Sequence, residues 1–504
     1  MFKKILVANR GEIALRIMRT CREMGIKTVA IYSKADKESL HAKYADEAYC
    51  IGLPQPNESY LNINKTLDIT KKTNTEAIHP GYGFLAQNPT FAEACETNSI
   101  EFIGPSSATL RKMGNKVAAR KTAVKVNVAV IPGAIEPVAN EDEAKKTAKT
   151  LGFPVLVKAV YGGGGRGMRI VNNEKEIKQA IELARLEAKT SFGNPKLYVE
   201  KMLEKPRHIE FQILADKKGN MVHLGERECS IQRRYQKLIE ETPSPMMTEE
   251  LRRKMGNAAI KAAKAANYVS AGTVEFLVDK EGDFYFLEMN TRLQVEHLIT
   301  EMVTSIDIVK EQIKIAAGET LLFKQRDIKL RGHAINCRIN AEDPYNDFEP
   351  CPGTITKYHP PGGLGVRVDS ALYEGYTIPV YYDSLIAKLA AWGNTREEAI
   401  ARIRNALNEY VVEGIETTIP FHKKILEDEQ YQLGNIHTNF VQERINSIAL
   451  AREHEYEDIA VLSAVVANYL QNHRTGVAVM PFRKTVKASF WKTRGLWSVD
   501  MQCT

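Results

Sequence analysis

Cysteine pairs and long apolar runs are both missing from this 504-residue sequence. Its seven cysteines, at positions 21, 50, 95, 229, 337, 351 and 503, form no Cys-x-x-Cys pair, which argues against a disulfide framework and against a cysteine-ligated zinc site. No apolar stretch approaches the ~20 residues that a membrane-spanning helix needs. The apolar stretch after Met1 is too short for a secretory signal. We therefore expect a cytoplasmic protein that is not inserted in a membrane.

The sequence also lacks a concentrated block of charge. The formal net charge is +7, but Lys and Arg are interspersed with Asp and Glu along nearly the whole chain. Proteins that bind nucleic acids usually cluster their basic residues, so this pattern favours an anionic small molecule over a nucleic acid as ligand. A chain of this length has room for about two to four domains.

The predicted elements indicate an α/β and α+β protein of several domains. Short apolar runs and amphipathic stretches alternate in the N-terminal part, at residues 4–8, 11–24, 28–32, 77–84 and 102–105. This alternation is typical of a doubly wound α/β domain. Asn9–Ala14 stands where a dinucleotide fingerprint would be but lacks G-x-G-x-x-G, so a nicotinamide cofactor is not favoured. Residues 331–446 are rich in strands and in Gly/Pro turns.

A predicted hairpin over residues 273–290 is the most informative pattern. Two alternating runs flank Glu281-Gly282, a dipeptide typical of a two-residue turn. Counting outward from that turn places Glu275 opposite Glu288, with Asn290 on the same face. Facing carboxylates destabilise a sheet, but oxygen ligands of this kind suit Mg²⁺. The alternative is a slipped register that leaves both acids in solvent.

A run of glycines, Gly162–Gly165, separates a strand that ends at Lys158 from one that begins at Met168. Glycine amides can approach phosphates closely, and Lys158 adds positive charge beside them. No Gly-Lys-Ser/Thr follows, so this is not a Walker loop. Together with the predicted metal site, the loop indicates a lid that closes over ATP. The alternative is a flexible connection without a ligand.

Polar residues follow the hairpin directly, in the segment Thr291–His297. Such clusters occur where an anionic substrate lies beside a metal-bound phosphate; the alternative is a charged loop before a helix. Lys116 is a further candidate phosphate contact, and Glu226–Lys237 is polar enough to form an anion-binding wall. His208 lies inside an alternating strand, where a core histidine is an equal interpretation.

Together these segments closely resemble the biotin carboxylase component of biotin-dependent carboxylases, which belong to the ATP-grasp superfamily. The resemblance runs from residue 1 to about residue 446. Its motifs are Ala8–Ala14, His79–Phe84, Gly162–Met168, Glu288–Arg292 with Gln294–His297, and Gly332–Ala334 with Cys337–Pro344. Within the family, Thr417–His422 and the size of the chain favour the two-subunit, archaeal-type pyruvate carboxylases over acetyl-CoA or propionyl-CoA carboxylases.

The resemblance implies a reaction and a role for each matching residue. ATP and bicarbonate would form carboxyphosphate, and the carboxyl group would pass to N1 of biotin. The implied ATP contacts are Lys116, Lys158, Gly164, Gly165, Glu200, Lys201, Leu203, His208, Tyr235, Glu275 and Glu288. Two ions of Mg²⁺ or Mn²⁺ would be bound by Glu275, Glu288 and Asn290. Bicarbonate would be held by Lys237, Arg292, Gln294, Val295 and Glu296.

The implied catalytic residues are Lys237, Arg292, Glu296 and Arg338. Glu296 would be the general base on bicarbonate, and Arg338 would stabilise the biotin enolate with Tyr82 beside it. The sequence departs from the family pattern at Tyr235, where a histidine is usual, and at Leu298, where a proline is usual. The first departure concerns a nucleotide contact, and the second is expected to loosen the turn behind Glu296.

The expected domains are residues 1–113, an ATP-grasp domain over 114–330 with a mobile lid at about 131–203, a C-terminal domain over 331–446, and an extension over 447–504. No Met-Lys-Met biotinylation motif is present, so biotin should arrive on a separate carrier and carboxyltransferase subunit. The family resemblance implies a homodimer of this chain inside the hetero-oligomer. The extension contains one amphipathic helical pattern and the tryptophans Trp491 and Trp497. We expect these to dock that subunit; the alternatives are an extra helix packed on this chain and a disordered end. Another ATP-grasp ligase and a non-catalytic nucleotide-binding subunit remain as alternative functions.

Overall fold

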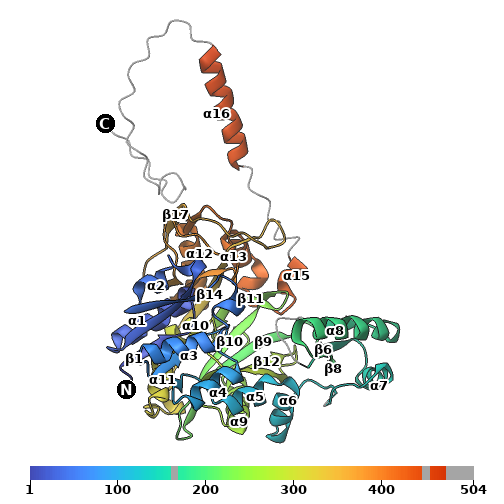
Figure 1. Cartoon of the computed structure of the whole chain (residues 1–504). Coiled ribbons are helices and arrows are strands. Elements are labelled where there is room, and N and C mark those ends of the chain that lie inside the picture. The colour runs from blue at the N-terminus through green and yellow to red at the C-terminus, as the bar shows by residue number, and fades with distance from the viewer. Residues whose placement is uncertain (135, 161–167, 445–454, 473–504) are drawn as a thin grey trace. The chain divides into compact units, whose positions relative to one another are not determined.

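The computed structural model describes residues 1–134, 136–160, 168–444 and 455–472 (Figure 1). The chain divides into two compact units, residues 1–450 and 451–504. Four residues singled out in the sequence, Gly164, Gly165, Trp491 and Trp497, lie outside the described residues. Every described helix is too short or too polar to span a lipid bilayer.

A five-stranded parallel sheet forms the N-terminal part of the first unit. Its order, β3-β2-β1-β4-β5, is that of a doubly wound sheet, as predicted. The strands are β1 (Lys4–Val7), β2 (Lys27–Ser33), β3 (Glu47–Gly52), β4 (Ala77–His79) and β5 (Glu101–Phe102), and the helices are α1 (Gly11–Glu23), α2 (Leu40–Tyr44), α3 (Ile63–Lys72) and α4 (Pro89–Thr97). The apolar pattern does not predict β3, because this edge strand alternates half-buried and exposed residues.

An eight-stranded antiparallel sheet forms the centre of the first unit, in the order β13-β12-β9-β10-β11-β14-β19-β18. Its strands are β9 (Arg207–Ala215), β10 (Met221–Arg233), β11 (Gln236–Thr242), β12 (Ser270–Val278), β13 (Phe284–Asn290), β14 (His333–Asn340), β18 (Val366–Ser370) and β19 (Leu385–Gly393). Strand β11 pairs directly with β14, from Ile239 opposite Cys337 to Thr242 opposite Ala334. The expected ATP-grasp and C-terminal segments therefore share one continuous sheet.

A smaller lobe lies within the expected lid segment (Figure 1). It contains a three-stranded sheet, β7-β6-β8, with β6 (Val155–Ala159), β7 (Met168–Val171) and β8 (Leu197–Lys201), and the helices α7 (Glu141–Leu151) and α8 (Ile177–Phe192). Ala144, Val157 and Ile181 belong to a hydrophobic cluster of its own. This lobe therefore has a small core separate from that of the large sheet.

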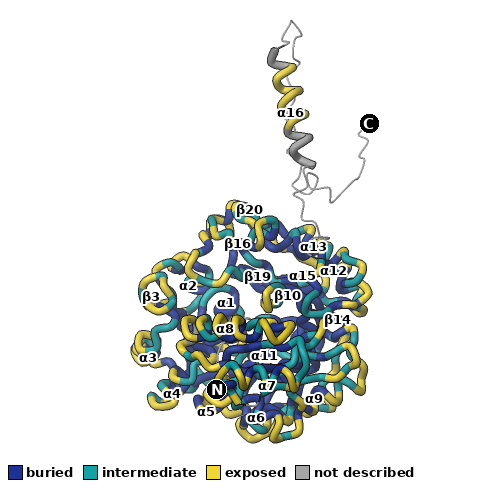
Figure 2. Tube along the Cα trace, turned by 90° about the vertical axis from the view of Figure 1, so that its right-hand side faces the viewer, coloured by how far each residue is buried: buried dark blue, intermediate teal, exposed yellow. Residues whose placement is uncertain are grey.

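The remaining helices cover the large sheet or connect its strands. Helix α9 (Glu249–Ala265) places a row of alanines against β9 and β12, and α12 (Arg396–Glu409) packs its isoleucines on β14 and β19. Figure 2 shows the buried residues gathered in the centre of this unit. The others are α5 (Ser107–Gly114), α6 (Lys116–Lys125), α10 (His297–Thr304), α11 (Ile308–Ala316), α13 (Ile419–Glu427), α14 (Glu429–Gln432) and α15 (Phe440–Arg444), with the small pairs β15 (Glu342–Asp343) and β16 (Glu349–Pro350), and β17 (Lys357–His359) and β20 (Val411–Glu413).

The second unit contains the described helix α16 (Glu455–Asn472). It includes the segment for which the extension predicted one amphipathic helix.

The β12–β13 hairpin confirms the predicted carboxylate pair but not the predicted turn. Glu275 faces Glu288, as expected. The turn is one residue longer: Asp279 N donates to Asp283 O at 2.9 Å, which leaves a three-residue loop whose last residue, Gly282, has φ +90°. A bulge between Phe286 and Glu288 offsets the extra residue. The longer turn and the bulge shift the register in opposite directions, so Glu275 still faces Glu288.

We expect Gly282→Ala to weaken this hairpin by about 1 kcal/mol, because L side chains disfavour a positive φ. Open space surrounds the position, so the cost comes from the backbone and not from a clash. Amide hydrogen exchange in β12 and β13 should become faster, and Gly282→Asn, which tolerates this conformation better, should change it less. Equal exchange in Gly282→Ala and the unaltered protein would contradict this reading of the turn.

Candidate active site

A cavity of about 570 Å³ opens where the N-terminal domain meets the large sheet. Its wall contains the start of α1, the segment after β4, and residues from β9, β11, β12, β13 and β14. Eleven of the predicted site residues line it: Tyr82, His208, Tyr235, Lys237, Glu275, Glu288, Asn290, Arg292, Gln294, Val295 and Arg338. Segments that are more than two hundred residues apart in sequence therefore contribute to one site.

A row of three carboxylates crosses the sheet beside this cavity. Glu210 on β9 is opposite Glu275 on β12, which is opposite Glu288 on β13. Facing like charges in a sheet repel one another, so this row needs a compensating cation. Glu210 was not among the predicted site residues, because the alternation over Arg207–Gln212 predicts only an ordinary strand.

Lys237 on β11 supplies that cation. Its Nζ lies 2.6 Å from Glu210 Oε2, 2.9 Å from Glu275 Oε1 and 2.8 Å from Glu296 Oε1. Burial alone would lower the pKa of Lys237, but the three carboxylates raise it well above its ordinary value. The ammonium therefore stays charged and joins acids from three separate elements.

Arg227 on β10, directly opposite Glu210 on β9, completes the charge balance. Its side chain is fully buried and pairs with Glu210 through Nε, while its other nitrogens donate to Gln212 Oε1 at 2.8 Å and to the hydroxyls of Thr300 and Thr273 at 3.0 and 3.2 Å. Removing one partner of such a buried pair would leave the other as an uncompensated buried charge, which destabilises the fold. Arg227 thus holds Glu210 in place behind Lys237.

Glu296 lies between two cations. Lys237 contacts its Oε1, and Arg338 Nη2 donates to its Oε2 at 2.9 Å. Burial would raise the pKa of Glu296, but Lys237, Arg338 and Arg227 together bring it well below the ordinary value. Arg338 also donates through Nε to Glu240 Oε1 at 2.6 Å. The Glu296 carboxylate is therefore ionised and held in one orientation.

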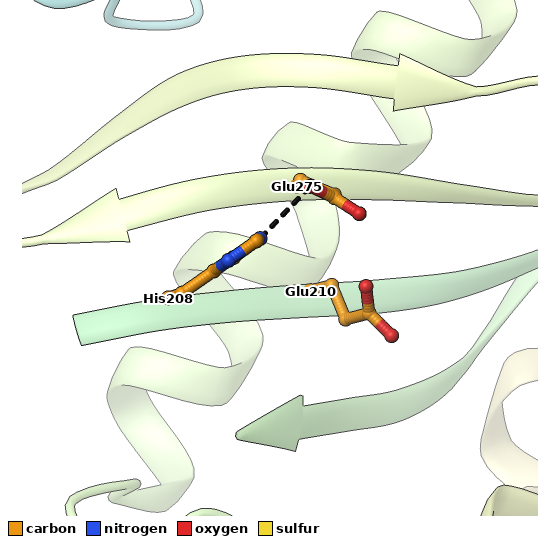
Figure 3. A group of neighbouring side chains, drawn as sticks. All are labelled: His208, Glu210 and Glu275. Carbon is orange, nitrogen blue, oxygen red and sulfur yellow. Dashed lines mark hydrogen bonds and ion pairs between the residues drawn. The ribbon is translucent and has the colours of Figure 1, made fainter. Parts of the chain in front are cut away.

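His208 and Glu275 form a second contact on the same face (Figure 3). His208 Nε2 lies 2.8 Å from Glu275 Oε2, and Glu210 projects beside them from β9. Burial would lower the pKa of His208, but Glu275 raises it above the usual range. Ligand atoms of His208, Glu210 and Glu275 all lie within 4.8 Å of one another. Glu275 is thus the carboxylate on which histidine, lysine and amide donors converge.

Arg292 lies at the end of β13 and orders the polar residues around it. Its guanidinium donates to Gln87 Oε1 and Gln294 Oε1, both at 2.8 Å, and to Asn290 Oδ1 at 3.1 Å. The Asn290 and Gln294 amides in turn donate to Glu275 at 2.8 and 3.0 Å. The guanidinium of Arg292 is therefore held at the cavity wall. The side-chain amides of Asn290 and Gln294 connect it to Glu275.

Tyr235 lies in the tight turn between β10 and β11. Arg234 and Tyr235 both have positive φ, at 48° and 64°, as a two-residue type I′ turn requires. Asp347 pairs with Arg233 and Arg234 beside this turn. The phenol is half exposed in the cavity wall, so the departure at Tyr235 leaves a polar side chain at the site.

Leu298, the other departure from the family pattern, is fully buried near the start of α10. It packs in a small cluster with Ile299, Val303, Ala334 and Ala390. The side chain therefore contributes to packing behind Glu296, and the looser turn stays a prediction.

Five predicted ATP contacts lie apart from the cavity lining, around the lid: Lys116, Lys158, Glu200, Lys201 and Leu203. Lys158 and Glu200 form a buried ion pair, with Arg120 3.5 Å from the same carboxylate. Lys201 Nζ donates to the carbonyls of Gly152 and Phe153 at 2.9 and 3.1 Å. These contacts hold the side chains of Lys158 and Lys201 close to the ends of strands β6 and β8.

Lys116 connects the lid residues electrostatically to the cavity. Burial lowers the pKa of Lys116, and the charges of Glu288 and Glu200 partly oppose that shift. Glu288 lines the cavity, whereas Glu200 belongs to the lid. The ammonium of Lys116 therefore interacts with acids of both groups.

Lys388 is a buried cation that the sequence interpretation missed. Its side chain is fully buried, and its Nζ lies 3.0 Å from Glu12 Oε2 and donates to Val295 O at 3.3 Å. Burial raises the pKa of Glu12 to about 7, and Lys388 opposes that rise. A lysine inside the apolar run Leu385–Ala391 is the signal that could have indicated this pair.

Fold and site together define an ATP-grasp ligase: a doubly wound domain, a small lid lobe and an antiparallel sheet with acids beside a cation-lined cavity. Three family profiles match the chain, described as the biotin carboxylase N-terminal domain over residues 1–110, the carbamoyl-phosphate synthase L chain ATP-binding domain over 115–324, and the biotin carboxylase C-terminal domain over 336–443.

Whole-chain relatives identify the family more narrowly. The chain is 54% identical to a pyruvate carboxylase subunit of Methanothermobacter thermautotrophicus, over 94% of this chain and 100% of that protein, and 56% identical to biotin carboxylase 1 of Bacillus subtilis, over 88% and 98%. A crystal structure of the biotin carboxylase domain dimer of Hydrogenobacter thermophilus 2-oxoglutarate carboxylase, with MgADP, ADP and bicarbonate, superposes with a TM-score of 0.87 at 50% identity, covering 90% of this chain and 99% of that one. The chain belongs to the biotin carboxylase family of ligases.

We expect Arg227→Leu to destabilise the protein by about 3–5 kcal/mol, because it leaves the buried Glu210 short of a cation. The thermal unfolding temperature should fall strongly in Arg227→Leu. It should rise part of the way back when Glu210→Gln is added to that variant. Arg253→Leu, on the exposed face of α9, is the control and should have little effect. An unchanged unfolding temperature in Arg227→Leu would contradict the proposed charge balance.

Proposed function

We propose that the chain carboxylates biotin on a separate carrier protein with ATP and bicarbonate, as the biotin carboxylase subunit of a pyruvate carboxylase. The observation that carries this proposal is Glu296, a buried carboxylate held between Lys237 and Arg338 at 2.8 and 2.9 Å. Such an arrangement offers a base and two cations to an anionic reactant. We further propose the domains 1–113, 114–330 and 331–446 for this activity.

Bicarbonate would bind at Lys237, Arg292, Gln294 and the Val295–Glu296 backbone. A planar guanidinium such as that of Arg292 can form two parallel hydrogen bonds to a planar oxyanion. An anion that drew Lys237 toward itself would weaken the contact that depresses the pKa of Glu296. The carboxylate would then become a stronger base at the moment when a bicarbonate proton must be removed. Basicity would thus depend on substrate binding.

The attacking bicarbonate oxygen would form a bond to the γ-phosphorus of ATP while the bond to the ADP oxygen breaks, which gives carboxyphosphate and ADP. Lys116, Lys158, His208, Tyr235 and the lid residues would hold the nucleotide, with positive side chains offsetting the charge of the phosphates. Glu200, Lys201 and Leu203 lie where the lid joins the large sheet, and would bind the base of the nucleotide. The C–O bond of carboxyphosphate would then break, and the phosphate that leaves would take the proton from N1 of biotin. The resulting enolate, stabilised by Arg338 with Tyr82 beside it, would form the bond from N1 to the carboxyl carbon.

The acids on β12 and β13 fit divalent cations by their donor chemistry. Glu275 and Glu288 face each other with Asn290 adjacent, and carboxylate and amide oxygens are ligands that Mg²⁺ prefers. Burial would raise the pKa of Glu275, but Lys237 and His208 bring it well below the ordinary value, so an anionic ligand is in place. When bound there, Mg²⁺ or Mn²⁺ would supply Lewis-acid stabilisation to the phosphates.

Pyruvate as the final acceptor is supported by the relatedness of the chain to a pyruvate carboxylase subunit over the full length of that relative. The acceptor would be bound by the partner subunit, which would also carry the biotin. Gluconeogenesis or replenishment of oxaloacetate would then be the metabolic role. A homodimer of this chain within the larger complex agrees with the dimer of the Hydrogenobacter relative.

We expect Glu296→Gln to reduce biotin-stimulated, bicarbonate-dependent ATP hydrolysis by roughly 10²-fold or more, because the variant keeps the shape of the side chain but loses the base. Nucleotide affinity, measured by isothermal titration, should remain. Glu281→Gln in the exposed hairpin loop is the matched control. Turnover like that of the unaltered protein would remove the assignment of Glu296, and the absence of biotin stimulation in the unaltered protein would remove the function itself.

The acceptor can be tested by reconstitution with the biotinylated carboxyltransferase subunit that co-purifies with this chain. Labelled bicarbonate should appear in oxaloacetate when pyruvate is supplied, and not in products of 2-oxoglutarate, acetyl-CoA or propionyl-CoA. Fixation with one of the other acceptors would retain the biotin carboxylase activity and contradict the choice of pyruvate.

A further inference from the structure

Large apolar residues are exposed in the middle of helix α16, the part that Figure 2 colours as exposed. These are Val461, Leu462, Val465, Val466 and Tyr469, with exposed fractions of 61%, 63%, 59%, 54% and 61%. Exposed apolar groups on a soluble protein are usually scattered singly. Five on consecutive turns of one helix are a contiguous patch of the kind that marks a contact surface.

The five side chains form one stripe. Residues in an α-helix advance by about 100° each, so Val461, Val465 and Tyr469 form one row and Leu462 and Val466 form the row next to it. Ser463 and Ala467 lie on the opposite side of the helix and are small. A single helix in water gains little from its own backbone hydrogen bonds. The stripe therefore requires a partner surface to stabilise it.

The distribution of α16 among relatives indicates what kind of partner this is. The family profiles end at residue 443, before α16. The match to the Methanothermobacter pyruvate carboxylase subunit spans 94% of this chain, or about 474 residues, so it reaches past the end of α16. The match to the Bacillus biotin carboxylase spans 88%, the share that residues 1–443 represent, and already uses 98% of that protein. The helix thus accompanies the relative that is named as a subunit.

A second copy of this chain is a less suitable occupant. The Hydrogenobacter structure is a dimer that covers 90% of this chain, or about 454 residues, and is itself covered to 99%. Since α16 begins at Glu455, the solved chains of that dimer match this chain only up to the start of the helix. The pairing of copies seen there is therefore made by the part of the chain that precedes α16.

We propose that α16 is the docking helix for the subunit that carries the carboxyltransferase and the biotin, and that its stripe binds in an apolar groove of that subunit. An amphipathic helix placed in a groove is a common mode of recognition, with anchors spaced one turn apart. Leu462, Val466 and Tyr469, which follow that spacing, are the central anchors. This inference rests on the proposed function, because it takes its partner from the two-subunit reaction.

The test uses the full chain and the purified, biotinylated carboxyltransferase subunit. The variant Leu462→Asp/Val466→Asp places two charges on the stripe, and Ser463→Asp/Ala467→Asp places the same two charges on the opposite side. We expect the first to weaken the Kd, measured by biolayer interferometry, by roughly 100-fold or more, as for loss of buried interface anchors, and the second to leave it nearly unchanged. Leu462→Ala/Val466→Ala, which preserves helix propensity, should weaken it by roughly tenfold.

Hydrolysis of ATP stimulated by free biotin separates this inference from the proposed function. It should be equal in all these variants, because the residues that line the cavity all belong to the first unit. Equal affinity of the two aspartate variants for the partner would overturn the docking proposal. The docking proposal would also be overturned if Leu462→Asp/Val466→Asp bound the partner normally but lost self-association in ultracentrifugation. The same holds if that variant bound the partner normally but no longer bound anionic phosphatidylserine vesicles. Absence of biotin stimulation in the unaltered chain would instead overturn the function, whatever the affinities.

Discussion

One largely buried ammonium group holds the candidate active site together. Lys237 contacts carboxylates from β9, β12 and the segment before α10, and each of these acids would otherwise face another negative charge in a poorly solvated position. Uncompensated buried charge costs several kcal/mol, so the three elements are stable in this arrangement only with the lysine between them. Arg227 and Arg338 compensate the same acids in the same way, Arg227 at Glu210 and Arg338 at Glu296. The site is consequently a network in which the state of any acid depends on two or three cations.

This network makes basicity a property of the assembly and not of Glu296 alone. A carboxylate beside one cation has a lower pKa, and beside two cations a much lower one. A reactant that engages either cation alters the proton affinity of Glu296 without touching it. The same cations that would hold bicarbonate or the biotin enolate thus regulate the base that acts on bicarbonate. Such coupling explains why an enzyme would bury three acids within reach of one lysine despite the cost to stability.

The sequence predicted the order of the N-terminal elements and the facing of Glu275 and Glu288, because strand alternation and turn signals are local. It predicted the pair through a wrong turn length, and a bulge that has no clear local signal restored the register. Glu210 and Lys388 were missed because their significance comes from pairing with distant strands and helices. The contacts of Lys237 likewise require the β11 strand to lie across the sheet from β12, which no short segment encodes. Local chemistry identified candidates, and long-range register decided which of them meet.

The continuity of the large sheet limits how this protein can be divided. Separating the chain near residue 330 would strip β14 from β11 and leave the backbone groups of Ile239–Thr242 as an open edge. Open edges promote association with other strands. Exchange of modules among carboxylases, whether by recombination or by design, should therefore succeed when residues 204–446 move as one piece, and the lid lobe, with its own small core, is the part that can be replaced separately.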